Sequence, residues 1–200
     1  MEQEHEGLGR AVKVVLTASQ PWRSRLCGAV GELCQIPSRF AVAIDVALGG
    51  AVRYVVAEDE RAAKQAISYL KDRKAGRTTF LPLDTLRSRQ RTADEERAAG
   101  EPGMLGFASD AISYDAKYEK VFSSLLGRTL LADTMDTGSA VARKYGHRLR
   151  IVCLDGTQFN AGGSLTGGSA RNQEGSLISR RALLQELQET CRRGQQRLET

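Results

Sequence analysis

The sequence predicts a mixed α/β (α+β) protein built from two similar small subdomains. Residues 28–49 align without a gap with residues 106–127, at an offset of 78 positions. In both copies apolar residues recur at i, i+4 and i+8 and a glycine follows, which predicts a helix that ends there. These apolar residues are Phe40, Ile44 and Leu48 in the first copy and Tyr118, Phe122 and Leu126 in the second. Short apolar strands alternate with helices around each copy, which favours small α/β units over an all-β sandwich.

The elements after each repeated helix also correspond. The expected elements are strand 55–59, helix 59–74 and strand 77–84 in the first half, and strand 130–134, helix 135–146 and strand 150–156 in the second. In the first of these helices, Ala63, Ile67 and Leu70 fall on one face. Each half therefore has the order strand, helix, strand, helix, strand.

The segment between the halves and the two chain ends differ from this pattern. Residues 87–103 contain almost no large apolar side chain and finish in Gly-Glu-Pro-Gly, which predicts a linker. Apolar residues at the ends have helical or heptad spacing: Leu8, Val12 and Val15 at the start, and Leu177, Leu184, Leu187, Cys191 and Leu198 at the finish. These ends are either terminal surface helices or two strands of an antiparallel coiled coil.

The whole chain has a net charge of +5, and its positive charge is concentrated in two clusters. Between residues 71 and 91, seven basic residues stand against Asp72 and Asp84, which gives this stretch alone a charge of +5. A second basic cluster comprises Arg143, Lys144, Arg148 and Arg150. Each cluster is either a solvated face or a salt-sensitive contact for the phosphate backbone of nucleic acid.

Composition argues against several functional classes. No apolar stretch approaches the roughly 18 to 20 residues that span a bilayer, and the acidic, polar N-terminus is no signal peptide. The four cysteines form no CxxC pair and the chain has only two histidines, so we expect no metal site. Scattered cysteines without an export signal indicate an intracellular protein with reduced thiols.

A glycine-rich segment, GGSLTGGS, follows the last expected strand. It contains Gly162, Gly163, Gly167 and Gly168, with Leu165 as its only bulky side chain. The chain contains no Gly-Lys dipeptide for a Walker loop, and the spacing fits neither a dinucleotide loop nor a G-x-S-x-G nucleophile elbow. Paired glycines remove Cβ atoms, so that a second strand can lie against them. That strand belongs either to the same chain or to another copy.

Several motifs in this order resemble the hinge domain of structural-maintenance-of-chromosomes (SMC) proteins. They are GRTTFLPLD in the first half, GFASD and LLGRTL in the second, and GHRLRIVCLDG followed by GGSLTGGS. The resemblance covers residues 10–181. It implies the SMC hinge fold, in which two similar α/β subdomains are flanked by coiled-coil helices. The expected parts are a coiled-coil stub at 1–18, subdomains at 19–86 and 104–176, the linker at 87–103, and a second stub at 177–200.

The resemblance also implies a homodimer in which the first subdomain of each copy faces the second subdomain of the other. The two glycine pairs, Gly162-Gly163 and Gly167-Gly168, with Leu165 between them, then lie at the dimer contact. Gly49, Gly50 and a strand over residues 51–56 are the candidates for the opposing surface in the first subdomain.

Weak contact with DNA is a further implication of the resemblance. The expected contact residues are Lys71, Arg73, Lys74, Arg77, Arg171, Arg180 and Arg181. Bacterial relatives carry a basic run after the glycines, whereas residues 170–173 here have Arg171 as their only charge. The rival hypothesis is a monomeric nucleic-acid-binding module that uses the basic stretch 71–91.

The parent of such a hinge is a chromosome condensation and segregation ATPase of the cytoplasm, associated with the nucleoid. Its ATPase heads, which bind kleisin and accessory subunits, lie outside this sequence. We therefore expect no catalytic residues and no cofactor in this chain.

Overall fold

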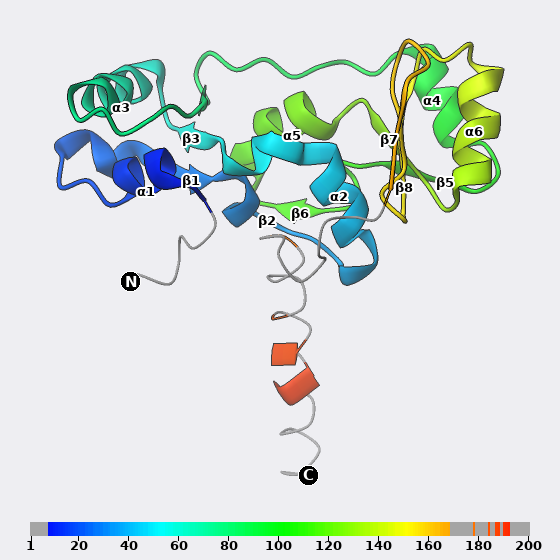
Figure 1. The fold of residues 1–200 in the computed structure, drawn as a ribbon, viewed down its shortest axis with the longest axis horizontal. Helices are drawn as coiled ribbons and strands as arrows, with labels where there is room; N and C mark the ends of the chain where they lie inside the picture. Colours follow the sequence, from blue (N-terminus) through cyan, green and yellow to red (C-terminus); the bar gives the residue numbers. More distant parts are fainter. Residues whose placement is uncertain (1–7, 169–177, 179–183, 185–186, 189, 193–200) are drawn as a thin grey trace. The chain divides into compact units, whose positions relative to one another are not determined.

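The computed structural model describes residues 8–168, 178, 184, 187–188 and 190–192. By its internal contacts the chain divides into two compact units. Unit 1 comprises residues 1–34, 48–91 and 113–128, and unit 2 comprises residues 35–47, 92–112 and 129–200. Each unit is built on its own β-sheet (Figure 1).

The two sheets share one topology, which confirms the repeat at the level of the fold. The strands of the first are β1 (Leu26–Ala29), β3 (Val55–Ala57) and β4 (Phe80–Pro82), and those of the second are β5 (Met104–Phe107), β7 (Thr129–Ala132), β8 (Arg150–Cys153), β9 (Gln158–Phe159) and β10 (Leu165–Thr166). In the order β1-β3-β4 the first pair is antiparallel and the second parallel. The order β5-β7-β8 has the same directions, and β9 and β10 extend that sheet. A separate pair joins β2 (Cys34–Gln35) to β6 (Ser113–Tyr114).

The repeated helices are α2 (Ala41–Leu48) and α5 (Glu119–Leu126), which keep the offset of 78. Both end where the sequence predicted, but for different physical reasons. Gly49 has φ 51°, a backbone conformation that favours glycine. Gly127 has φ −60°, and a Cβ there would collide with the backbone oxygen of Ser123.

Gly28 and Gly106, which the repeat aligns, occupy equivalent irregularities in the first strand of each sheet. The register shifts between Leu26 and Gly28 in β1 and between Met104 and Gly106 in β5. The two glycines have φ 138° and 89°. A bulge of this kind bends the strand, and glycine adopts a positive φ at little cost.

The two units do not coincide with the two sequence repeats, because α2 of the first repeat belongs to unit 2 and α5 of the second repeat belongs to unit 1. Residues 41–47 of α2 belong to unit 2, where Arg150 Nη2 donates to the Ala47 carbonyl at 2.8 Å. Helix α5 belongs to unit 1, where Lys120 Nζ donates to the Leu83 carbonyl at 3.4 Å. The boundaries 19–86 and 104–176 follow the sequence repeat and stay a prediction.

The central strands in unit 2 are buried on both faces, and helices cover one of them. Leu130, Ile151 and Cys153 pack in one cluster with side chains of α4 (Ala93–Ala99) and α6 (Met135–Lys144). Leu131 and Val152 alternate with them and are also fully buried. Strands buried on both faces have continuous apolar sequences, which explains the short apolar runs that identified them.

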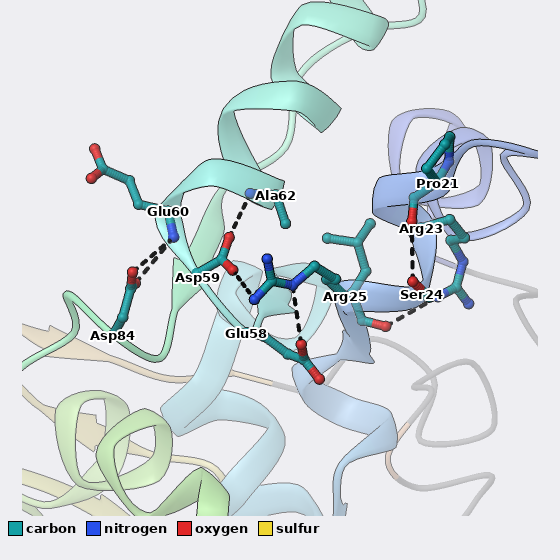
Figure 2. A network of polar contacts seen from close by, with 10 residues as sticks. Pro21, Arg23, Ser24, Arg25, Glu58, Asp59, Glu60, Ala62 and Asp84 are labelled. Atoms are coloured by element: carbon teal, nitrogen blue, oxygen red, sulfur yellow. Dashed lines mark hydrogen bonds and ion pairs between the residues drawn. The ribbon is translucent and has the colours of Figure 1, made fainter.

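Helix α3 (Glu60–Asp72) is held at its N-terminus by two carboxylates, as Figure 2 shows. Asp59 is the N-cap and accepts from the Ala62 N–H at 2.7 Å, while Asp84 accepts from the Glu60 N–H at 3.0 Å. Arg25 forms ion pairs with Asp59 and Glu58. The final Asp of the FLPLD motif therefore fixes the position of α3 relative to β4.

The face of α3 that carries Ala63, Ile67 and Leu70 is buried only in part. Ala63 and Leu70 are 4% exposed, whereas Ile67 is 38% exposed. Ala66, which is fully buried, takes its place. The helix packs closely enough that a small side chain fits where the spacing alone favoured a large one.

The segment 87–103, expected as a linker, contains the helix α4. Thr92 accepts from the Glu95 N–H and the Glu95 carboxylate accepts from the Thr92 N–H, which forms a capping box. Ala98 is fully buried. The helix anchors through alanine, so the absence of large apolar residues did not indicate a free linker.

Helix α1 (Arg10–Leu16) packs against α3 and β1 (Figure 1). Leu8, Val12 and Val15 are buried. Near the other end, Ile178 is buried. Leu184 and Leu187 have helical backbone conformation, and their side chains are more than half exposed. Leu177 and Leu198 lie outside the described residues. The assignment of 1–18 and 177–200 to coiled-coil stubs stays a prediction.

We expect Asp59→Ala to lower the free energy of unfolding by about 1 kcal/mol, because α3 loses its N-cap. Urea denaturation followed by circular dichroism measures this difference. Asp72→Ala is the matched control, since a carboxylate at the C-terminal end of the same helix gains nothing from the helix dipole. Equal midpoints for Asp59→Ala and the unchanged chain would contradict the capping role.

Candidate dimerisation surface

The glycine-rich segment forms the β9–β10 hairpin at the edge of the second sheet. Its turn is closed by the Asn160 N–H, which donates to the Ser164 carbonyl at 2.9 Å, and by the Gly163 N–H, which donates to the Asn160 carbonyl at 3.1 Å. The Gly162 N–H donates to the His147 carbonyl at 2.8 Å. The turn is therefore fixed within its own unit before any partner binds.

The four glycines of the hairpin are not equivalent. Gly162, Gly163 and Gly168 have φ 97°, 92° and 131°, so their own backbone conformation disfavours a side chain. Gly167 has no such conformation, and a Cβ there would make only an ordinary contact with Thr157 at 3.6 Å. Local backbone geometry thus accounts for three of the glycines, whereas nothing in the described part of the protomer requires the fourth.

The hairpin presents an open surface. Residues 161–168 are all exposed, and Leu165 is 58% exposed although it is a large apolar side chain. In the described part of the chain, β10 pairs on one side only, with β9. An edge strand with an exposed apolar residue is a template for pairing with another strand.

Gly49 and Gly50 also lie on an open surface, although the expected strand over 51–56 is wrong for its first half. Residues Gly49–Arg53 form the 3-10 helix η4, and a Cβ at either glycine would meet nothing within 4 Å. Val55 and Val56 belong to β3, which is the central strand of its sheet and fully buried. The apolar run alone did not distinguish a central strand from an edge strand, so only η4 offers a surface to a partner.

His147 supports the hairpin, and sequence reasoning missed this role. It has φ 54°, in the left-handed region, and its carbonyl accepts from the Gly162 N–H. Its Cβ would lie 3.8 Å from a Cβ built on Gly163. The contact joins positions far apart in the sequence and carries no local pattern.

The basic residues expected to contact DNA stay exposed where the structure describes them. Lys71, Arg73, Lys74 and Arg77 lie at the end of α3 and in the loop after it. The Arg73 guanidinium lies over the Tyr69 ring, 4.5 Å from its centroid. Arg171, Arg180 and Arg181 lie outside the described residues.

Two of the four members of the second basic cluster form ion pairs within their own unit. Lys144 Nζ lies 2.6 Å from Glu101 Oε1, and hydrogen bonds from Lys144 and Tyr145 lower the pKa of Glu101. Arg148 lies 3.8 Å from Asp94, and Arg150 is half-buried, with its pKa lowered by desolvation. Most of these residues line an open groove of about 590 Å³ that contains both positive and negative side chains: Asp94, Arg97, Glu101, Lys144, Tyr145 and Arg148.

The cysteines form neither a disulfide nor a metal site in the described residues. Burial raises the pKa of Cys153 to about 12, with Asp155 and Asp133 adding to the shift. Cys153 is therefore a protonated core thiol at neutral pH. Among the described helices, none has the length and apolar character needed to cross a membrane.

Comparison with protein families matches residues 23–142 to the model described as SMC proteins Flexible Hinge Domain. The chromosome partition protein Smc of Desulfitobacterium hafniense is 44% identical over 202 residues, covering 98% of this chain and 17% of that protein. The Smc protein of Bacillus subtilis is 38% identical, covering 94% of this chain and 16% of that protein. The chain thus spans about a sixth of the length of these relatives.

Two solved structures agree with the fold. An asymmetric dimer of the Geobacillus stearothermophilus SMC hinge domain matches with a TM-score of 0.85 and 36% identity, covering 96% of this chain and 77% of that one. The Pyrococcus furiosus SMC hinge domain matches with a TM-score of 0.66 and 33% identity, covering 82% and 83%. These matches confirm the α/β hinge fold that the motifs predicted, and the chain belongs to the family of SMC flexible hinge domains.

Proposed function

We propose that this chain is a homodimerisation hinge that joins two coiled-coil arms of an SMC protein. The exposed edge hairpin with Gly167 and Leu165 is the observation that carries the proposal. Gly49 and Gly50 on η4 provide a second open surface for the other side of the contact. The asymmetric dimer found for the Geobacillus hinge supports self-association of this chain.

The parent protein, in this proposal, is an ATPase of chromosome condensation and segregation. Its nucleotide-binding heads, and the kleisin and accessory subunits that bind there, lie outside these 200 residues. The hinge then acts mechanically: it holds the arms together, and its opening admits or releases DNA. The proposed location is the cytoplasm, at the nucleoid.

Light scattering at micromolar concentration should give about twice the chain mass of 21.8 kDa. Pairing of β10 with a partner strand removes the open side of β10 from water and so stabilises the dimer. The measured mass should stay at the dimer value on dilution until the protein concentration approaches Kd. A species of 21.8 kDa throughout that range would contradict the proposal.

Gly167→Ala and Gly50→Ala should weaken the dimer without unfolding the protomer. Neither position has a positive φ, and neither Cβ would collide with the described residues of its own chain. An extra methyl group in a close-packed contact costs about 1–3 kcal/mol, which raises Kd roughly fivefold to more than a hundredfold. Sedimentation equilibrium measures Kd directly.

Gly100→Ala is the matched control for these variants. It adds the same methyl group outside the proposed surface, 3.5 Å from the Arg97 carbonyl, and also lacks a positive φ. Gly162, Gly163 and Gly168 are unsuitable, because alanine would strain their backbone whether or not a partner binds. Unchanged Kd for both test variants would argue that neither glycine lies in the dimer contact.

Contact with DNA through the basic stretch 71–91 is the second candidate function. The exposure of Lys71, Arg73, Lys74 and Arg77 favours it, either within the dimer or as the activity of a monomer. Charge reversal at Arg73, Lys74 and Arg77 should abolish binding to a duplex oligonucleotide. Binding should also fall with salt, by about 0.9 log units per tenfold salt for each neutralised phosphate. Fluorescence anisotropy at several salt concentrations measures both effects, and undiminished binding by the charge-reversed variant would exclude this stretch.

A further inference from the structure

A groove of about 370 Å³ in unit 1 is lined by three arginines from three separate segments. Arg10 begins α1, Arg53 ends η4, and Arg77 lies between α3 and β4. The lining contains no acidic side chain among the described residues. Only Arg77 belongs to the basic stretch 71–91. Arg10 and Arg53 lie far from it in the sequence and are brought beside it by folding.

Local backbone geometry delivers two of the arginines to the groove. Gly9, with φ 83°, precedes Arg10, and Gly76, with φ 96°, precedes Arg77. Both glycines adopt a conformation that other residues avoid, and each turns the chain just before an arginine.

The three charges are not neutralised by the described residues. None of the three guanidinium groups forms an ion pair within the part of the chain that the structure describes, and all three residues are exposed. The groove of unit 2 is different, because Glu101 and Asp94 there pair with the basic side chains. Three like charges around one groove repel one another, so an anion that enters it is attracted by all of them.

Hydroxyl groups and apolar walls complete the groove. Tyr54, Thr78 and Thr79 are lining residues that carry hydroxyl groups, and the Thr78 hydroxyl donates to the Arg53 carbonyl at 3.5 Å. Leu8 and Val12, both buried, provide apolar surface beside the charges. Guanidinium groups bind phosphate oxygens through paired N–H donors, and neighbouring hydroxyls donate to the remaining oxygens.

We propose that this groove binds a phosphate group through Arg10, Arg53 and Arg77. The source is either the backbone of DNA or a free phosphate, since both present the same oxygens. With DNA as the source, the inference rests on the proposed DNA contact and extends it to Arg10 and Arg53, which lie outside the stretch 71–91. Gly50 also lines the groove, so phosphate binding and the proposed dimer contact adjoin each other.

The test compares the intact chain with the double variant Arg10→Ala/Arg53→Ala in two arms. One arm titrates inorganic phosphate and follows the amide NMR signals of Thr78 and Thr79. The other measures anisotropy of a labelled duplex oligonucleotide over a series of salt concentrations. Arg61→Ala is the control, because it removes an exposed charge from α3 that does not line the groove.

We expect the double variant to bind roughly tenfold more weakly. Its salt slope for duplex DNA should be smaller by about 0.9 for each phosphate that the removed arginines neutralise in the intact chain. Arg61→Ala should bind as the intact chain does. An effect in either arm supports the site and identifies the source of the phosphate. Affinity unchanged from the intact chain in both arms would overturn the inference, whatever the oligomeric mass.

Two further measurements keep the outcome clear. Light scattering on the same samples separates this site from the dimer surface, because a variant that binds phosphate more weakly but keeps the dimer mass supports the site alone. Arg53→Gln, measured alongside, gives the same readout should the double variant fail to fold.

Discussion

The fold depends on the exchange of α2 and α5 between the two repeats. The central strand of the three-stranded sheet β1-β3-β4 is buried on both faces, so this sheet needs packing partners on both sides. Contacts assign α2 to unit 2 and α5 to unit 1, so each unit receives a helix from the other half of the chain. Each unit therefore combines elements of both repeats, which makes the duplicated halves interdependent.

This interdependence gives the proposed dimer surface a rigid base. β8 is covered on one face by the cluster that includes α4 and α6, and Arg150, on that strand, bonds to the end of α2. The hairpin that extends this sheet is closed by its own turn and by the His147 carbonyl. An edge strand fixed in this way loses little conformational entropy when a partner binds, which favours association.

Electrostatics separates two surfaces that look alike in the sequence. In unit 2, Lys144 and Arg148 form ion pairs with Glu101 and Asp94, so the charge of these two side chains is offset within the unit. In unit 1, Arg77 lines a groove together with Arg10 and Arg53, and the described lining of this groove contains no acidic residue. Surface ion pairs contribute little to stability, but they decide which basic side chains remain available to an anion.

Sequence alone determined the repeat, the order strand, helix, strand, helix, strand within each half, and the family. Helical spacing and terminal glycines were sufficient because they reflect local conformation, as Gly49 illustrates with its positive φ at the end of α2. Tertiary structure alone decided which half each helix packs on and that β3 is central. Both depend on contacts between distant segments, such as that of Arg150 with Ala47, and a pattern of neighbouring residues does not encode them. The helix α4 within 87–103 did have a local signal, the capping box of Thr92 and Glu95, but its burial through Ala98 is again a tertiary contact.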